Sequence, residues 1–212
     1  MATTLFAGHM HPVTDELIRI VKSAGRNVAV ASARHTSLHQ PGEGMLHVPW
    51  SPRSSLSAKA ACTHVRNAFG SFDECVLTLS PEPCRGSLPE LGISEMEQYM
   101  DETLRASLYF AREVLALFTA QSEGVLSLVL LDDPEAVYAP LEQMVRSGLA
   151  GFAESLVTQY RTGVPAVYAS VGAPGPDQVE EFATFCRTER GERARGRVQR
   201  YGRRGALRGL FK

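Results

Sequence analysis

Hydrophobic positions along this chain follow two alternating patterns. Short, nearly uninterrupted apolar runs are typical of strands buried on both faces. Longer stretches place apolar residues every three or four positions, as in an amphipathic helix. The runs predict strands over residues 3–7, 27–33, 45–50, 75–79, 125–131 and 165–171. The periodic stretches predict helices over residues 13–24, 55–69, 94–121 and 140–161.

This alternation predicts a parallel sheet covered on both faces, because parallel strands need long, right-handed crossover connections. We therefore expect an α/β fold, a doubly wound, Rossmann-like parallel sheet of about six strands with helices on both faces and a basic C-terminal extension. No seventh strand is recognisable. Ligands of such sheets bind beyond the carboxyl ends of the strands, where the strand order reverses. We expect any small-molecule site around residues 8–14, 32–39, 50 and 80–85.

Charge is distributed unevenly along the 212 residues, although the net charge is only −1. Residues 1–186 carry 12 basic and 21 acidic side chains, a net −9, and residues 187–212 carry 10 basic and 2 acidic ones, a net +8. We interpret residues 1–186 as one domain and residues 187–212 as an Arg/Gly-rich basic tail. We favour an acidic protein surface as the partner of this tail. Polyanions such as RNA and anionic membrane surfaces remain alternatives.

Two further features bear on the compartment in which the protein resides. No apolar run reaches the roughly 18 residues that suggest a membrane-spanning helix, and the first residues lack the pattern of a signal peptide. We expect a cytoplasmic protein with no transmembrane segment. The four cysteines show no Cys-x-x-Cys spacing, so we expect free thiols at Cys62, Cys75, Cys84 and Cys186.

The turn after the first predicted strand reads GHMHP over residues 8–12. A dinucleotide-binding turn needs several glycines, so that a pyrophosphate can approach the backbone and the amide groups of the next helix. Here Pro12 lacks an amide hydrogen, and Asp15 and Glu16 add carboxylates to the first helical turn. We predict a turn closed to phosphate, with Gly8 and Arg34 as the remaining candidate cofactor-binding residues.

Four of the six histidines follow the first two predicted strands, namely His9, His11, His35 and His39. These strands are neighbours in the expected sheet, so the four imidazoles could converge to ligate Zn²⁺, or to bind an anion when protonated. We favour the alternative of four exposed loop histidines without a shared ligand. The spacing of the sequence places no carboxylate or thiolate beside them.

Four segments, in this order, resemble the short-chain dehydrogenase/reductase family over about residues 3–171. LFAGHMHPVTDELIRIVKSAGRNVAVASAR resembles its opening βαβ unit, and AFGSFDECVLTLSP resembles its fourth strand and the following Asn-Asn-Ala-Gly turn. MDETLRASLYFAREVL and VRSGLAGFAESLVTQYRTGVPAVYASV are similar to its two long helices and the strand after the second. The resemblance lies in framework, order and spacing.

Membership of this family implies a nicotinamide cofactor and a Tyr-x-x-x-Lys pair, in which the lysine lowers the pKa of the tyrosine. By the alignment, this pair falls on Glu142 and Arg146. The asparagine of the proton relay falls on Thr103, and the aspartate near the adenine falls on about Trp50, whose indole could fill the adenine pocket. No catalytic residue carries over. Tyr138 lies near the aligned position of the tyrosine and is a candidate acid, but the residue four positions after it is not a lysine.

The two long helices, residues 94–121 and 140–161, correspond to the helices that form a dimer interface in this family. The second helix carries a surface of small residues at 147–148 and 150–151, suited to close helix contact. Both helices carry apolar residues on more than one face. We predict a homodimer, or a heteromer with a related subunit, through these helices.

Loss of both the glycines and the catalytic pair leads to three hypotheses. The first is a non-catalytic subunit, without a cofactor, that serves protein assembly through its long helices and basic tail. An atypical NAD(P)-dependent oxidoreductase using Tyr138 or a partner's residues is the alternative. The second alternative is a nucleic-acid-associated protein acting through residues 187–212.

Overall fold

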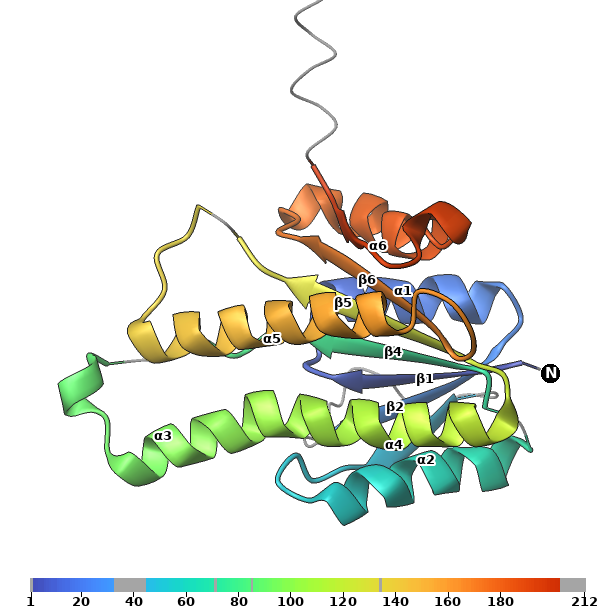
Figure 1. Ribbon diagram of the computed structural model, residues 1–212, viewed down its shortest axis with the longest axis horizontal. Helices are drawn as coiled ribbons and strands as arrows, with labels where there is room; N and C mark the ends of the chain where they lie inside the picture. Colours follow the sequence, from blue (N-terminus) through green and yellow to red (C-terminus); the bar gives the residue numbers. More distant parts are fainter. Residues whose placement is uncertain (1, 33–44, 71, 85, 134, 203–212) are drawn as a thin grey trace, which may run out of the picture.

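The computed structural model contains a seven-stranded sheet between two layers of helices (Figure 1). It describes residues 2–32, 45–70, 72–84, 86–133 and 135–202. All strand pairs are parallel, in the order β3-β2-β1-β4-β5-β6-β7. This arrangement confirms the predicted doubly wound α/β fold with helices on both faces.

The predicted strands and helices are present in the predicted order, and their bounds lie close to the predicted ones. The strands are β1 (Thr3–Gly8), β2 (Asn27–Ser32), β3 (Met45–Pro49), β4 (Glu74–Leu79), β5 (Val125–Leu131), β6 (Ala166–Gly172) and β7 (Val198–Arg200). The α-helices are α1 (Pro12–Ser23), α2 (Ser55–Phe69), α3 (Ile93–Met100), α4 (Ala106–Gln121), α5 (Pro140–Gln159) and α6 (Val179–Thr188). Single helical turns are η1 (Leu88–Glu90), η2 (Asp101–Arg105), η3 (Pro176–Gln178) and η4 (Glu192–Ala194).

Each face of the sheet has its own apolar core. The α1 and α6 side is built around Phe6, Val76 and Phe182, all fully buried. Helices α2, α4 and α5 cover the other face (Figure 1), where Phe110 and Phe118 are fully buried. Since both faces are covered, every residue of β4 is buried, which explains its uninterrupted apolar run.

Packing at the start of β5 depends on a glycine. The rings of Phe118 and Phe72 lie 5.1 Å apart. Gly124 has φ +135°, and a Cβ atom there would lie 2.3 Å from the Phe118 ring. A side chain at this position would displace Phe118 from the core.

The predicted helix over residues 94–121 is divided in the structure. Helix α3 continues into the π-helical turn η2, and α4 begins at Ala106. The apolar periodicity did not reveal this turn, because one extra residue in one turn hardly disturbs a stripe repeating every three or four positions. Helix α3 extends beyond the carboxyl ends of the strands (Figure 1).

A seventh strand, β7, is present at the edge of the sheet, contrary to the sequence expectation of about six. Val198 lies opposite Ala169 in β6, so β7 comes from the segment interpreted as the basic tail. Helix α6 precedes it and was not predicted either. Residues 203–212 lie outside the described residues, and the tail's partner, nucleic acid included, stays a prediction.

The small residues of α5 face different surroundings. A Cβ atom on Gly148 would lie 3.4 Å from Leu104 of the same chain, whereas nothing lies within 4 Å of one on Gly151. Part of this surface therefore packs internally, against η2. Leu108 and Met144 remain exposed, and subunit pairing through these helices stays a prediction.

Neither membrane spans nor disulfides occur in the described ranges. No helix there is both long and apolar enough to cross a bilayer. All four thiols are free. Burial raises the pKa of Cys62 and Cys186 to about 12, which keeps both thiols protonated and unreactive at neutral pH.

Candidate functional site

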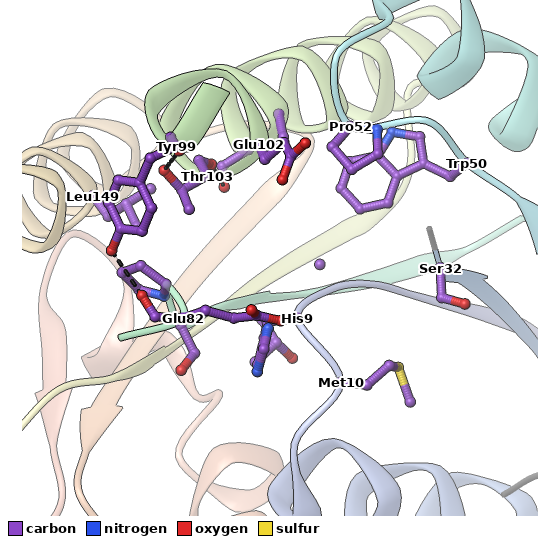
Figure 2. A pocket seen from close by; sticks show the side chains of 16 residues that line it. His9, Met10, Ser32, Trp50, Pro52, Glu82, Tyr99, Glu102, Thr103 and Leu149 are labelled. Carbon is purple, nitrogen blue, oxygen red and sulfur yellow. Dashed lines mark hydrogen bonds between the residues drawn. The ribbon is translucent and has the colours of Figure 1, made fainter. Parts of the chain in front are cut away.

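A cavity of about 300 Å³ lies at the carboxyl ends of β1, β2 and β4, under the segment that joins α3 to α4 (Figure 2). The chain runs from β1 outward to β3 and then returns to β4 on the other side of β1. This reversal is the switch point at which ligands of such sheets bind. The lining residues are Gly8, His9, Met10, Ser32, Trp50, Pro52, Thr78, Ser80, Pro81, Glu82, Tyr99, Glu102, Thr103, Ala106, Ser107 and Leu149.

The floor of the cavity is formed where β1 ends against β4. Gly8 has φ +96°, and a Cβ atom there would lie 2.2 Å from the carbonyl oxygen of Thr78. The same oxygen accepts a hydrogen bond from the backbone N–H of His9, at 3.2 Å. Gly8 lines the cavity, and its missing side chain serves the close approach of the two strands.

The backbone amide groups at the start of α1 are already engaged. His11 accepts hydrogen bonds from three residues of the first turn: Nδ1 accepts from Val13 N–H at 3.2 Å, and its carbonyl oxygen accepts from Thr14 at 2.7 Å and Asp15 at 3.1 Å. Pro12 has no N–H. The N-terminus of α1 therefore does not fit a pyrophosphate bound through helix amides, as the sequence predicted.

Replacing His11 with alanine is expected to lower the free energy of unfolding by about 1 kcal/mol, because the N-cap acceptor is lost. Burial, then the charge of His9, lowers the pKa of His11 below its ordinary 6.5. The cap's contribution is therefore complete above pH 6.5 and is lost as the pH falls through the lowered value. Urea unfolding across this range measures it. His11→Asn should retain the cap without the pH dependence. If stability depended on pH equally in His11→Asn and the unmodified protein, the capping role of His11 would be contradicted.

Glu142 and Arg146, on which the sequence resemblance places the catalytic pair, form a buried ion pair. Glu142 is 4% exposed. It accepts hydrogen bonds from Arg146 Nε at 2.9 Å and from the backbone N–H of Cys84 at 3.0 Å. Arg146 also donates to the carbonyl oxygens of Leu131 and Pro81. Neither side chain lines the cavity, and the pair ties α5 to the loops after β4 and β5.

Tyr138, the displaced candidate acid, lies beside this ion pair. The guanidinium carbon of Arg146 lies 4.0 Å from the centre of its ring, and its hydroxyl accepts from the backbone N–H of Asp133 at 3.1 Å. Tyr138 is not among the residues that line the cavity. A catalytic role for it stays a prediction.

Tyr99 lies in the cavity wall, although the sequence did not single it out. Its hydroxyl donates to the carbonyl oxygen of Glu82 at 2.8 Å (Figure 2). Burial, and then the carboxylate of Glu142, raises the pKa of Tyr99, so its phenol stays protonated. Thr103 lies one helical turn later, in η2, and donates to the Tyr99 carbonyl at 2.5 Å. The two residues are spaced one helical turn apart in the sequence, and this spacing could have indicated that they lie on the same side of a helix.

Trp50 forms the wall at the end of β3. The indole is 6% exposed and packs edge-on against Phe110, with ring centres 5.0 Å apart. Its Nε1–H has no hydrogen-bond partner among residues 2–32, 45–70, 72–84, 86–133 and 135–202. An unpaired buried donor costs free energy, so this N–H is a local destabilising feature of the wall.

The predicted histidine cluster is only partly described. His9 lines the cavity and His11 caps α1. His35 and His39 lie outside the described residues, as does Arg34. Within the described part of the chain, no group of three or more His, Cys, Asp or Glu side chains is placed to hold a metal ion.

Comparisons with known proteins identify the fold. No family model matches the sequence, and a search of curated proteins finds no match. Among solved structures, a short-chain dehydrogenase/reductase from Serratia marcescens has 16% identity and a TM-score of 0.68, over 94% of this chain and 94% of that one. A Brucella melitensis 3-ketoacyl-(acyl-carrier-protein) reductase complexed with NADH has 12% identity and a TM-score of 0.76, over 94% and 96%. A Leptospira borgpetersenii short chain dehydrogenase with bound NAD⁺ has 11% identity and a TM-score of 0.76, over 94% and 90%.

These similarities correct the first functional hypothesis. The chain has the fold of short-chain dehydrogenases over 94% of its length, and two of these structures hold a nicotinamide nucleotide. A non-catalytic assembly subunit without a cofactor is therefore the wrong main interpretation, and the oxidoreductase alternative agrees better with the neighbours. The motif losses were misleading because a cavity of about 300 Å³ is nevertheless present at the switch point.

Proposed function

We propose that this chain is an atypical NAD(P)-dependent oxidoreductase that binds a nicotinamide nucleotide in the cavity at the carboxyl ends of β1, β2 and β4. The observation that carries the proposal is the cavity itself, which remains open at the switch point. Chains of the same fold are bound to NADH and NAD⁺. Since the start of α1 does not fit a pyrophosphate, the side chains of the cavity would supply most of the binding energy.

The lining residues fit the nicotinamide ring and its ribose. Ser80 offers a hydroxyl group to ribose or carboxamide, and the Trp50 side chain offers an aromatic wall, whereas the hydroxyls of Thr78 and Ser107 are already bonded to Thr14 and to the Thr103 carbonyl. Glu82 and Glu102 contribute carboxylates, whereas the described lining contains no lysine or arginine. An oxidised nicotinamide ring is cationic, so this wall favours the oxidised form over the reduced one. On the protein, such a preference favours hydride transfer from the bound reduced ring to a substrate.

Two side chains that line the cavity, His9 and Tyr99, suit a reaction that adds a hydride and a proton to a carbonyl group. When bound, the reduced nicotinamide supplies a hydride to a carbonyl carbon. We propose that the imidazole of His9 gives the proton to the carbonyl oxygen, because histidine transfers protons readily near neutral pH. The Tyr99 hydroxyl stays protonated and can turn from the Glu82 carbonyl to orient the substrate oxygen. Tyr99 thus positions the substrate and His9 supplies the acid.

Thermal unfolding with nucleotides tests the binding. NAD⁺, NADP⁺, NADH and NADPH are compared with nicotinamide mononucleotide and ADP-ribose. At 100 times its dissociation constant, a ligand adds about 2.7 kcal/mol of stability. We expect at least one dinucleotide and nicotinamide mononucleotide to raise the unfolding temperature, and ADP-ribose to act more weakly. No response to any dinucleotide would refute the proposal.

The proton-donor role is tested separately by oxidation of reduced nicotinamide with a panel of ketones and aldehydes. His9→Gln should lose turnover while retaining the nucleotide-dependent shift of the unfolding temperature. His64→Gln, an exposed histidine away from the cavity, is the matched control and should behave as the unmodified protein. Unchanged turnover in His9→Gln would remove His9 from the mechanism.

A further inference from the structure

The cavity wall that follows β4 includes a loop, residues 81–84, without regular secondary structure. Pro81 and Glu82 line the cavity, next to Ser80 at the end of the strand. The carbonyl oxygen of Glu82 accepts a hydrogen bond from the Tyr99 hydroxyl at 2.8 Å (Figure 2). This bond is lost when Tyr99 turns to a substrate, so the loop then needs other contacts to keep its position.

Two such contacts come from the buried ion pair of α5. Arg146 Nη2 donates to the Pro81 carbonyl oxygen at 3.4 Å, and Glu142 Oε2 accepts from the backbone N–H of Cys84 at 3.0 Å. The bond within the pair uses different atoms, because Arg146 Nε donates to Glu142 Oε1 at 2.9 Å. The pair therefore holds the loop on both sides of Glu82, independently of the phenol.

The ion pair is itself anchored to the end of a central strand. Arg146 Nη1 donates to the carbonyl oxygen of Leu131, the last residue of β5, at 2.8 Å. The same nitrogen lies 3.6 Å from Asp132 Oδ1, and the Tyr138 ring covers the guanidinium group at 4.0 Å. The Arg146 side chain is only 10% exposed. A buried guanidinium with several partners keeps one orientation, so the position of β5 determines where the loop lies.

We propose that Glu142 and Arg146 are positioning residues, which fix the loop over residues 81–84 so that Tyr99 can leave the Glu82 carbonyl without moving the cavity wall. This inference rests on the proposed oxidoreductase function, because it assigns the loop to the nucleotide and substrate site. Neither side chain of the pair lines the cavity, and both act through the backbone of the loop. The pair therefore has a role in the site different from that of the tyrosine and lysine with which the resemblance aligns it.

Arg146→Lys tests the proposal, because lysine keeps the positive charge beside Glu142 but lacks the planar fork that reaches several acceptors at once. The first readout is the alkylation rate of Cys84, whose thiol is half-buried while the other three are buried. We expect the variant to react several-fold faster, since a released loop exposes the thiol. If Arg146→Lys does not fold, hydrogen exchange of the Cys84 amide in the unmodified protein decides: protection supports the proposal, and exchange as fast as in an unbonded loop contradicts it.

The second readout is steady-state turnover of the reduced nucleotide. Its KM should rise about tenfold in Arg146→Lys, roughly the effect of one lost charge-assisted hydrogen bond, while kcat changes less. The matched control is Arg26→Lys, the same change in an arginine that pairs with buried Glu74 at the other end of the sheet. It should keep the KM and the alkylation rate of the unmodified protein. If Arg146→Lys lowered only the unfolding temperature, the positioning role would be overturned. Lack of nucleotide binding by the unmodified protein would refute the proposed function instead, and alkylation would still decide whether the pair fixes the loop.

Discussion

Replacing Glu74 with alanine is expected to lower the free energy of unfolding by about 3–5 kcal/mol, the cost of removing one partner from a buried ion pair. The carboxylate is 5% exposed and is the shared acceptor of Arg26, Arg187 and Arg190. Without it, Arg190 keeps a largely buried charge whose remaining acceptor, among the residues that the structure describes, is the Cys186 carbonyl. The loss should loosen the C-terminal end of α6 from the face of the sheet that it covers before the central strands unfold.

Acid unfolding provides an independent readout of Glu74. Burial by itself raises its pKa, but the charges of Arg190 and Arg187 outweigh burial and hold the pKa below the ordinary 4.5. The carboxylate's contribution is therefore present above pH 4.5 and is lost as the pH falls through the lowered value. Urea unfolding at several pH values should show a smaller acid-side loss of stability in Glu74→Ala than in the unmodified protein.

The matched control for this substitution is Glu180→Ala, which removes a carboxylate that is 78% exposed from its contact with Arg19. Exposed ion pairs contribute little, so this variant should unfold almost as the unmodified protein does. If Glu74→Ala lowered the free energy of unfolding no more than Glu180→Ala does, the cluster of three arginines around Glu74 would not stabilise the fold.

Gly8→Ala is expected to destabilise the protein by about 2–5 kcal/mol, the sum of a left-handed backbone penalty and an overpacking penalty. Gly8 has φ +96°, and the new methyl group would lie 2.2 Å from the Thr78 carbonyl oxygen. That oxygen belongs to the backbone and cannot turn aside. The two central strands would have to separate at the floor of the cavity, so nucleotide binding should fall as well.

Gly25→Ala separates the two contributions, because Gly25 has φ +73° and a Cβ atom added there would meet nothing within 4 Å. This control should show the backbone penalty alone. Chemical unfolding of both variants therefore measures the strand contact as a difference. If Gly8→Ala were no less stable than Gly25→Ala, the tight approach of β1 and β4 would be contradicted.

The first turn of α1 shows how far local chemistry can be predicted. Pro12 and the two carboxylates at Asp15 and Glu16 indicated a turn closed to phosphate, and the hydrogen bonds to His11 agree with that interpretation. These contacts span only a few residues, so sequence neighbours determine them. The further conclusion, that the chain had lost its chemistry, did not follow, because the cavity also depends on distant residues such as Tyr99 and Trp50.

The elements that the hydrophobic pattern did not predict leave no periodic signal in the sequence. Strand β7 has three residues in an arginine-rich segment, and it forms because β6 offers an unpaired edge. The π-helical turn η2 keeps the apolar stripe of its helix intact. Both are decided by neighbours in space, which single-sequence patterns do not contain.

By itself, the sequence determined the order of strands and helices as far as β6 and the doubly wound sheet, because burial on one or both faces leaves a repeating apolar pattern. Tertiary structure alone decided which polar groups meet. It brought His9, Tyr99 and Trp50 to one cavity and three arginines to Glu74. Contacts between residues tens of positions apart depend on how the crossovers return the chain to the sheet, and no local pattern records that.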